Sequence, residues 1–513
     1  MILHVDKAVN TYYVQTLCLV FFPGSKFGQN ETSSPENPEV TVRVLSHTDT
    51  AAEAEAIILY RGKETRGVGR AEVNQHFDHA KALQVAVGHA VFEAGKKYFG
   101  YMPPWGILTG VRSSKIASEL LLAGNGVRNT KQILRDEYLV NPKKAHLAVS
   151  VATNEMRLTR RLPDNLCSVY VSIPFCPSRC AYCSFVSYTS AKLLSLVDSY
   201  LQTLFVDIAH VFHVIREKGL QVATVYIGGG TPTVLNEKQL DALLACITKE
   251  VAPESLMEFT LEAGRPDTIT AEKLRIAHEY GVTRISVNPQ SLSDDVLRAI
   301  GRRHTVEDFF HAFALAEKSG IRDINVDLIA GLPGDEFSNF SSTVDQVISL
   351  RPTNITVHTF SVKKASDLLR EEENVYSMKG GDASQCVEYS QLKTRIAGYK
   401  PYYMYRQRNT VGNLENVGYA LEGAEGMYNM FMMGELHSIF AVGAGAVTKL
   451  VAYQDKKSGK RSIERIFMPK YPYEYLRDAE KIRLGDPAKG LLSYRERVDL
   501  GLSPSKTLTE EDA

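Results

Sequence analysis

Three of the chain's seven cysteines lie within eight residues, at a spacing that suits a metal cluster. The segment around Cys176, Cys180 and Cys183 reads C-x3-C-x2-C and directly follows a β-rich run. Thiolates are soft ligands that bind Fe–S clusters or zinc. Structural zinc commonly takes four protein ligands, and no fourth Cys or His lies nearby in the sequence. The pattern favours a [4Fe–4S] cluster with one iron left open, and the alternatives are zinc or three buried cysteines.

The other four cysteines give no metal pattern. An odd total in a long chain argues against a disulfide framework. We expect Cys18, Cys167, Cys246 and Cys386 to act as small buried apolar residues.

The elements that must position the cysteine segment are short β-rich runs that alternate with longer helical runs from about residue 165 to 360. The six β-rich runs are 168–173, 224–229, 257–263, 284–288, 323–329 and 354–360. Short connections between such units predict a parallel sheet. Right-handed crossovers would curl this sheet into an open barrel or a doubly wound sheet. In either case the site lies at the carboxyl ends of the strands.

Polar residues follow several of these runs, where a charged, hydroxyl-rich nucleoside could bind. The segment 228–233 (GGGTPT) follows the second run, and its glycines allow close backbone approach. Glu262 ends the third run, Gln290 follows the fourth, and Arg302, suited to a carboxylate, follows the next helix. Asp327 lies inside the fifth run. The alternatives are a tight turn at the glycines and a buried structural acceptor at Asp327.

The cysteine spacing, with the aromatic Tyr182 before the third cysteine, resembles the signature of the radical S-adenosylmethionine (SAM) superfamily. The resemblance implies a partial (β/α)6 radical SAM barrel. It also implies that the open iron chelates the amino and carboxylate groups of SAM. One electron then cleaves the C–S bond, and the resulting 5′-deoxyadenosyl radical takes hydrogen from the substrate. The protein binds, orients and shields the radical.

A narrower resemblance rests on four strings between residues 165 and 340. They are YVSIPFCPSRCAYCSF, YIGGGTPT, RISVNPQSL with GRRHT, and NVDLIAGLPGD. Together they resemble the oxygen-independent coproporphyrinogen III oxidase (dehydrogenase) family. The long N-terminal region and residues 402–423 resemble its HemZ-type subgroup.

This narrower resemblance implies two sets of SAM-binding residues. Tyr170, Gly229 and Glu262 match positions that contact a first SAM. The positions that contact a second SAM in the best-known members match Tyr182, Gly230, Thr231, Gln290, Arg302 and Asp327. The chain departs from the family with Ala-Gly-Arg-Pro after Glu262, where Asn-Pro is common, and with Asn-Pro before Gln290, where Gly-Val is usual. Whether one or two SAM molecules bind stays open.

The implied reaction is oxidative decarboxylation of two propionates of coproporphyrinogen III to vinyl groups in haem biosynthesis. It requires a tetrapyrrole substrate, an electron donor such as flavodoxin or ferredoxin, and an electron acceptor, because the substrate radical loses CO2 and one electron. Arg406 and Arg408 are candidates for meeting the substrate's carboxylates, with solvated surface arginines as the alternative. The rival functions are a haem chaperone of the same branch, which could use His437 or His358, and a radical SAM reaction on another substrate.

The bulk composition fits a cytoplasmic protein with several domains. Lys+Arg and Asp+Glu both number 59, which removes any global charge argument for nucleic acid or an anionic membrane. The N-terminus lacks a signal-peptide layout, and no run of 18 apolar residues occurs.

We expect an N-terminal α+β domain (1–155), the barrel (156–375) and a mixed C-terminal extension (376–513). The first domain or the segment 400–450 is expected to cover the barrel mouth, with Trp105 offering a flat apolar face and Arg112 a carboxylate partner.

Overall fold

The computed structural model describes residues 1–27, 36–110, 112–183, 187–361, 381–407, 410–455 and 460–503. The chain forms two compact units. Unit 1 comprises Met1–Leu158, Val357–Leu392 and Pro401–Gly418, and unit 2 comprises Thr159–Thr356, Lys393–Lys400 and Tyr419–Ala513. The predicted domain boundaries near residues 155 and 375 stay a prediction. Among the described residues, no helix combines the length and the apolar character needed to cross a membrane.

Unit 1 contains a four-stranded sheet covered by a long helix. The strands run in the order β1 (Ile2–Val5), β2 (Glu39–His47), β3 (Ala51–Tyr60) and β4 (Lys63–Glu72), and only the β1–β2 pair is parallel. The helix α2 (His79–Phe99) packs on β3 and β4. A Cβ on Gly67 or Gly69 would lie 2.2 or 2.1 Å from a backbone oxygen of α2, so the close approach requires glycine. The α+β character expected for the N-terminal region is confirmed.

The remaining elements of unit 1 hold a buried polar network around Glu415. They are α1 (Thr11–Phe21), α3 (Ser113–Leu122), α4 (Val127–Asp136), α5 (Pro142–Thr159) and, largely in this unit, α13 (Gly381–Ile396), β11 (Lys400–Arg406) and β12 (Glu415–Ala420). Lys144 Nζ lies 2.6 Å from the Glu415 carboxylate, and Trp105 Nε1 donates to it at 2.9 Å. Trp105 is 0% exposed. The prediction that its ring offers a free face is therefore wrong.

Unit 2 contains the predicted barrel. Its strands are β5 (Leu166–Ile173), β6 (Gln221–Gly229), β7 (Glu258–Leu261), β8 (Arg284–Ser286), β9 (Asp323–Ala330), β10 (Asn354–Thr359), β13 (Ile439–Val442), β14 (Val447–Asp455) and β15 (Lys460–Phe467). They run in the order β10-β9-β8-β7-β6-β5-β13-β14-β15. The pairs from β5 to β9 are parallel, β13 adds to β5 in parallel, and β13, β14 and β15 pair antiparallel. The six predicted β-rich runs are thus confirmed as β5 to β10.

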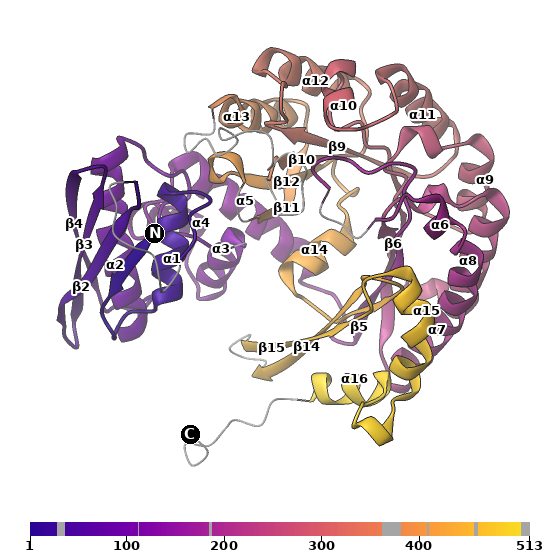
Figure 1. The fold of residues 1–513 in the computed structure, drawn as a ribbon, viewed down its shortest axis with the longest axis horizontal. Helices are drawn as coiled ribbons and strands as arrows, with labels where there is room; N and C mark the ends of the chain where they lie inside the picture. The colour runs from indigo at the N-terminus through magenta and orange to yellow at the C-terminus, as the bar shows by residue number, and fades with distance from the viewer. Residues whose placement is uncertain are drawn as a thin grey trace. The chain divides into compact units, whose positions relative to one another are not determined.

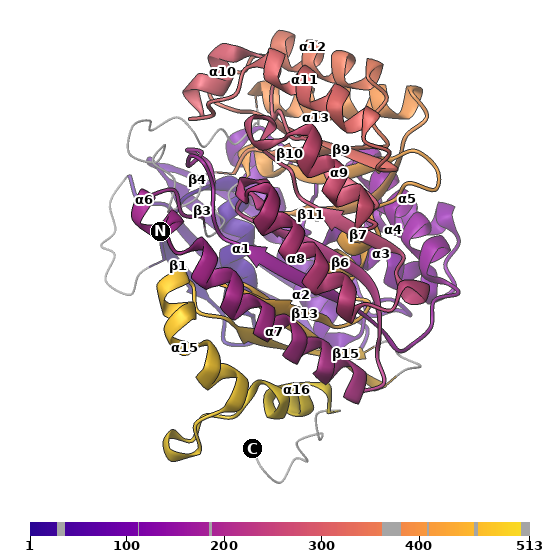
Figure 2. The same cartoon turned by 90° about the vertical axis from the view of Figure 1, so that its right-hand side faces the viewer.

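The helices of unit 2 follow the strands in the predicted alternation. They are α6 (Ala191–Leu194), α7 (Val197–Glu217), α8 (Glu237–Glu250), α9 (Ala271–Glu279), α10 (Asp294–Ala299), α11 (Val306–Lys318), α12 (Phe337–Ser349), α14 (Met427–Gly434), α15 (Pro472–Leu484) and α16 (Tyr494–Leu502). Figures 1 and 2 show α7, α8 and α9 side by side on the outer face of the strands. Helix α11 begins with a capping box of Thr305 and Asp308. The capping box fixes the start of the helix directly after residues 301–304.

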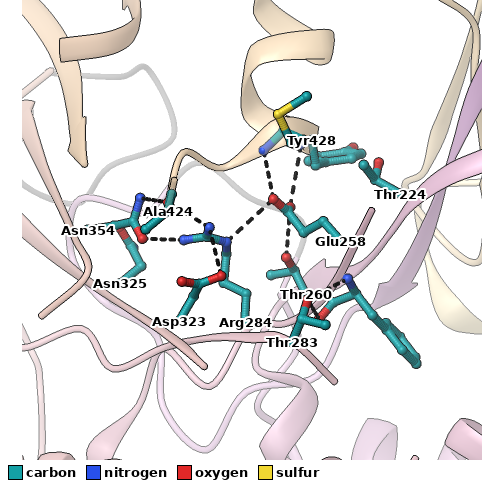
Figure 3. Close-up of polar contacts among 12 residues, drawn as sticks. Thr224, Glu258, Thr260, Thr283, Arg284, Asp323, Asn325, Asn354, Ala424 and Tyr428 are labelled. Atoms are coloured by element: carbon teal, nitrogen blue, oxygen red, sulfur yellow. Dashed lines mark hydrogen bonds and ion pairs between the residues drawn. The ribbon is translucent and has the colours of Figure 1, made fainter. Parts of the chain in front are cut away.

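The amino ends of the strands carry a network of buried charges (Figure 3). Glu258, Arg284 and Asp323 are the first residues of β7, β8 and β9. Arg284 Nε lies 3.4 Å from the Glu258 carboxylate, and its Nη2 lies 3.3 Å from that of Asp323. Arg284 Nη2 also donates to the Ala424 carbonyl at 2.8 Å, and Glu258 accepts from the Met427 N–H at 2.7 Å. The C-terminal segment before α14 therefore closes this end of the barrel.

Candidate functional site

The cysteine segment forms a loop that begins where β5 ends, at Ile173. Cys176 and Cys180 are buried and Cys183 is half-buried, and none of the three forms a disulfide. The Cys176 N–H donates to the Tyr188 carbonyl at 3.1 Å, and the Cys183 N–H donates to the Cys180 carbonyl at 3.1 Å. The backbone of the loop is thus held at both ends.

The glycine segment after β6 packs directly on this loop. The Thr231 N–H donates to the Phe175 carbonyl at 2.7 Å, and Thr231 Oγ1 lies 3.3 Å from Cys176 Sγ. A Cβ on Gly230 would lie 2.5 Å from the Phe175 carbonyl oxygen. Gly229 has φ +109°, which side chains other than glycine rarely adopt. The structure therefore brings the two predicted segments together and explains two of the three glycines.

Glu262 lies directly after β7, beside the glycine segment. A Cβ on Gly228 would lie 2.7 Å from its Oε2 atom, so any other residue at this position would require the carboxylate to shift. Burial raises the pKa of Glu262 to about 8, and the nearby Asp327 adds to the rise, whereas a backbone hydrogen bond from Gly229 opposes it. Such a carboxyl group is neutral until a cation approaches it, as a ligand ammonium would.

Asp327, in β9, is held by two amides. Asn288 Nδ2 donates to one carboxylate oxygen at 2.9 Å, and Asn325 Nδ2 donates to the other at 2.7 Å. The Asp327 N–H donates to Asn288 Oδ1 at 3.1 Å. Asp327 is therefore a hydrogen-bonded acceptor that also acts on Glu262 through its charge.

Arg302 and Tyr182, both predicted site residues, contact each other. Arg302 Nη2 donates to the Tyr182 hydroxyl at 3.1 Å, and its Nη1 donates to the carbonyls of Asn288 at 2.7 Å and Gly264 at 3.1 Å. Although burial alone would lower the pKa of Arg302, the Tyr182 phenol and the Cys180 thiol raise it. The guanidinium therefore lies beside the cysteine loop and ties it to the third and fourth strand ends.

Gln290 combines an unusual backbone with an unpartnered side-chain atom. Its φ is +72°, and its N–H donates to the Asp327 carbonyl at 3.1 Å. Its Oε1 atom is buried and has no hydrogen-bond partner among the described residues. A left-handed conformation in a residue with a side chain costs on the order of 1–3 kcal/mol. Strain and an open acceptor in one residue are typical of a ligand-contacting position.

Sequence reasoning missed two buried groups near Gln290. His304 lies beside the Pro289 carbonyl, but neither ring nitrogen makes a hydrogen bond of normal geometry with the described residues. Burial, followed by the charges of Arg302 and Arg265, lowers the pKa of His304 to about 3. Burial raises the pKa of Asp335 to about 6, although the Ser291 hydroxyl opposes the rise. His304 lies in the GRRHT string and Asp335 in the GLPGD string. Both strings supported the family resemblance but assigned no role to these two residues.

A tyrosine stack, also missed in part, fills the barrel beside Glu262. The ring centroid of Tyr226 lies 6.0 Å from that of Tyr170 and 4.5 Å from that of Tyr428. Burial raises the pKa of each of these phenols, and the charge of Glu262 adds to the rise. Tyr170 was predicted as a SAM contact. Tyr428 lies in the C-terminal extension, and no sequence motif pointed to it.

Arg265, in the departure that follows Glu262, was also missed. Its Nη1 atom donates to Cys180 Sγ at 2.9 Å, and its Nη2 atom donates to the Ser178 hydroxyl. The Ala-Gly-Arg-Pro string was noted as a difference from the family, but no role followed from the sequence.

Of the predicted substrate arginines and haem-binding histidines, three have partners within the protein and one lies outside the described residues. Arg406, in unit 1, is buried and donates to the Leu108 carbonyl and the Asn413 side chain, so the prediction that it meets a substrate is wrong. Arg408 lies outside the described residues. His437 Nε2 lies 2.7 Å from Ser168 Oγ, and burial lowers its pKa to about 3. His358 Nδ1, in unit 1, lies 3.2 Å from the Tyr405 hydroxyl.

Comparisons with known proteins agree on one superfamily. The profile of the Radical SAM superfamily matches residues 170–347. The chain is 35% identical over 424 residues to the oxygen-independent coproporphyrinogen-III oxidase-like protein HemZ of Bacillus subtilis, covering 80% of this chain and 83% of that one. It is 38% identical over 197 residues to the haem chaperone HemW of the same species, covering 38% of this chain and 51% of that one. The solved structure of coproporphyrinogen III oxidase (HemN) from Escherichia coli has a TM-score of 0.49 at 21% identity, covering 64% of this chain and 72% of that one.

Proposed function

The chain belongs to the radical SAM superfamily and, within it, to the HemZ-type oxygen-independent coproporphyrinogen III oxidase-like family; from this premise we propose that it oxidatively decarboxylates propionate side chains of a porphyrinogen to vinyl groups. Membership of the superfamily implies a [4Fe–4S] cluster and SAM. Coproporphyrinogen III is the proposed substrate. The supporting observation is the packing of the glycine segment on the cysteine loop, with the raised-pKa carboxyl of Glu262 beside it.

The cysteine loop fits the implied cluster. Cys176, Cys180 and Cys183 would hold it, and when bound it supplies one electron to cleave SAM. The three cysteines lie in one loop, and no fourth Cys or His is near them in the sequence to complete a structural zinc site. The ligand set therefore favours the cluster over zinc.

The first SAM would lie over the ends of β5, β6 and β7. The glycine segment lets the backbone approach a ligand closely there, and Glu262 can accept from the SAM amino group or the ribose hydroxyls. The ammonium would ionise Glu262 as it binds and would form a charge-assisted hydrogen bond. Tyr170 provides an aromatic wall beside this carboxylate.

The positions assigned to a second SAM divide into two groups. Tyr182, Arg302 and Asp327 already make hydrogen bonds within the protein, whereas Gln290 presents an acceptor without a partner. We propose that one SAM binds tightly and that any second ligand contacts Gln290, Gly230 and Thr231. Calorimetric titration of SAM into the reconstituted protein gives the stoichiometry.

The second candidate function is haem transfer, which the 38% identity to HemW over 197 residues favours. Both histidines named for this role already have a hydrogen-bond partner within the protein. His437 is neutral and hydrogen-bonded to Ser168, and His358 contacts Tyr405. These contacts support the enzymatic proposal over the chaperone.

The deciding experiment is an anaerobic assay of the reconstituted protein with coproporphyrinogen III, SAM and dithionite. We expect protoporphyrinogen IX and 5′-deoxyadenosine, and we expect a flavodoxin or ferredoxin to replace dithionite as donor. A parallel titration with haem tests the rival function. A stoichiometric haem complex without porphyrinogen turnover would overturn the enzymatic proposal in favour of the chaperone.

A further inference from the structure

Arg265 reaches the cysteine loop from the turn that follows β7. Its side chain is 4% exposed. The Nη1 atom donates to Cys180 Sγ at 2.9 Å, and the Nη2 atom donates to the hydroxyl of Ser178, which lies between the first two cysteines. One guanidinium therefore contacts both a proposed cluster ligand and the loop that carries it.

We propose that Arg265 is a positioning residue that holds the Cys180 thiolate and raises the reduction potential of the cluster. The proposal rests on the proposed function, since it requires a [4Fe–4S] cluster on these cysteines. It goes beyond the family resemblance, because Arg265 lies in the Ala-Gly-Arg-Pro string where the family commonly has Asn-Pro.

The direction of the effect follows from charge. Reduction brings one electron from a one-electron reductant into the cluster, and no bond to the protein forms or breaks. A buried cation that donates a hydrogen bond to a ligand sulfur stabilises the extra negative charge. Low effective dielectric strengthens this interaction relative to one at the surface. Arg265 should therefore make the reduced cluster easier to reach.

Two neighbouring charges set the size of the effect. Asp267 Oδ1 lies 3.6 Å from Arg265 Nε and neutralises part of the charge, but its side chain is 25% exposed and so partly screened by water. Arg302 also acts on Cys180 through its charge and a side-chain hydrogen bond, and it donates as well to Tyr182, Asn288 and Gly264. Arg265 differs from Arg302 in that it donates both to the Cys180 sulfur and to Ser178 of the loop that carries it.

The turn that carries Arg265 does not depend on its side chain. The Arg265 carbonyl accepts from the Thr268 N–H at 3.0 Å and from the Thr268 hydroxyl at 2.8 Å. Lys273 Nζ donates to the Thr268 carbonyl at 3.1 Å. We therefore expect variants of Arg265 to fold.

The test is a potentiometric titration of the reconstituted cluster, followed by electron paramagnetic resonance, in wild type, Arg265→Met, Arg265→Lys and Arg303→Met. Arg265→Met should lower the ratio of reduced to oxidised cluster about tenfold at a fixed solution potential, which is about 59 mV for a one-electron couple. Arg265→Lys keeps the charge and should recover most of the shift. The control Arg303→Met removes an exposed guanidinium and should leave the potential unchanged.

Asp267→Asn provides an arm of opposite sign, because it removes the charge that opposes Arg265. It should raise the potential, and it decides the matter if Arg265→Met fails to hold iron. The role of Arg265 would be overturned by an unchanged potential in Arg265→Met or by an equal shift in Arg303→Met. If Arg265→Met holds no iron, an unchanged potential in Asp267→Asn would overturn it instead. Failure of the wild-type protein to assemble a four-iron cluster would instead overturn the proposed function.

Discussion

Strand β7 has a glutamate at each end, and the two lie in opposite environments. Glu258, at the amino end, accepts from the backbone N–H of Met427 and faces Arg284. Glu262, at the carboxyl end, has the acid Asp327 as its charged neighbour, and among the described residues no cation lowers its pKa. The carboxylate of Glu258 is thus a paired structural charge, whereas the pKa of Glu262 is raised.

The same contrast extends around the barrel. At the amino end Arg284 bridges Glu258, Asp323 and the Ala424 carbonyl (Figure 3). At the carboxyl end the Gln290 Oε1 atom and both His304 ring nitrogens are buried without a hydrogen bond of normal geometry among the described residues. Buried polar groups are normally satisfied, so these two residues are candidates for ligand contact.

The largest expected effect is at the carboxyl end of the barrel, where removing a cysteine should remove the proposed [4Fe–4S] cluster. Changing Cys176, Cys180 or Cys183 to Ala should abolish cluster assembly, because two thiolates cannot hold the cubane with a defined open iron. Iron and sulfide after anaerobic reconstitution measure this. The matched controls Cys167→Ser and Cys246→Ser should keep full iron content. Four irons in a triple-Ala variant would refute the assignment.

At the amino end the largest effect should be on stability. Arg284→Met would leave the buried carboxylate of Glu258 without its cation and Asp323 with Arg322 alone, and breaking a buried pair costs about 3–5 kcal/mol of unfolding free energy. Chemical denaturation measures the loss. The control Arg298→Met removes an exposed partner of Asp295 and should change stability by less than about 1 kcal/mol. Equal stability of the two variants would mean that the network is not a structural closure.

The third test returns to the carboxyl end. Glu262→Gln should weaken SAM binding about tenfold or more while leaving iron content intact, because a charge-assisted hydrogen bond is worth roughly 1.5–3 kcal/mol. Calorimetry in two buffers should also show that wild type releases a proton when SAM binds below pH 8, and that the variant does not. Unchanged affinity and unchanged proton release would make Glu262 a structural residue.

The sequence predicted what depends on local pattern. Strands buried on both faces appear as apolar runs, so β5 to β10 were visible, and the position of Glu262 followed from parallel topology. The contacts that explain the site join residues far apart in the chain. Arg265 and Cys180 are 85 residues apart, Glu258 and Met427 are 169 apart, and Trp105 and Glu415 are 310 apart. No periodicity or spacing encodes such pairs, which is why Arg265, Tyr428 and the burial of Trp105 required the folded structure.

The smallest expected effect is the dependence of stability on pH. Unfolded Glu262 ionises near its ordinary pKa of 4.5, whereas folded Glu262 keeps its proton until about pH 8. Between these values the native state binds more protons than the unfolded state, so stability falls as pH rises. Glu262→Gln removes this fall, so its stability advantage over wild type should grow from pH 5 to pH 8. The half-buried carboxyl is partly screened by water, so we expect a stability advantage on the order of 1–2 kcal/mol.

Denaturation of both proteins without cofactors, at pH 5, 6.5 and 8, measures this advantage. A constant difference across this range would mean that Glu262 is ionised throughout, and the contrast with Glu258 would then lie in their partners alone.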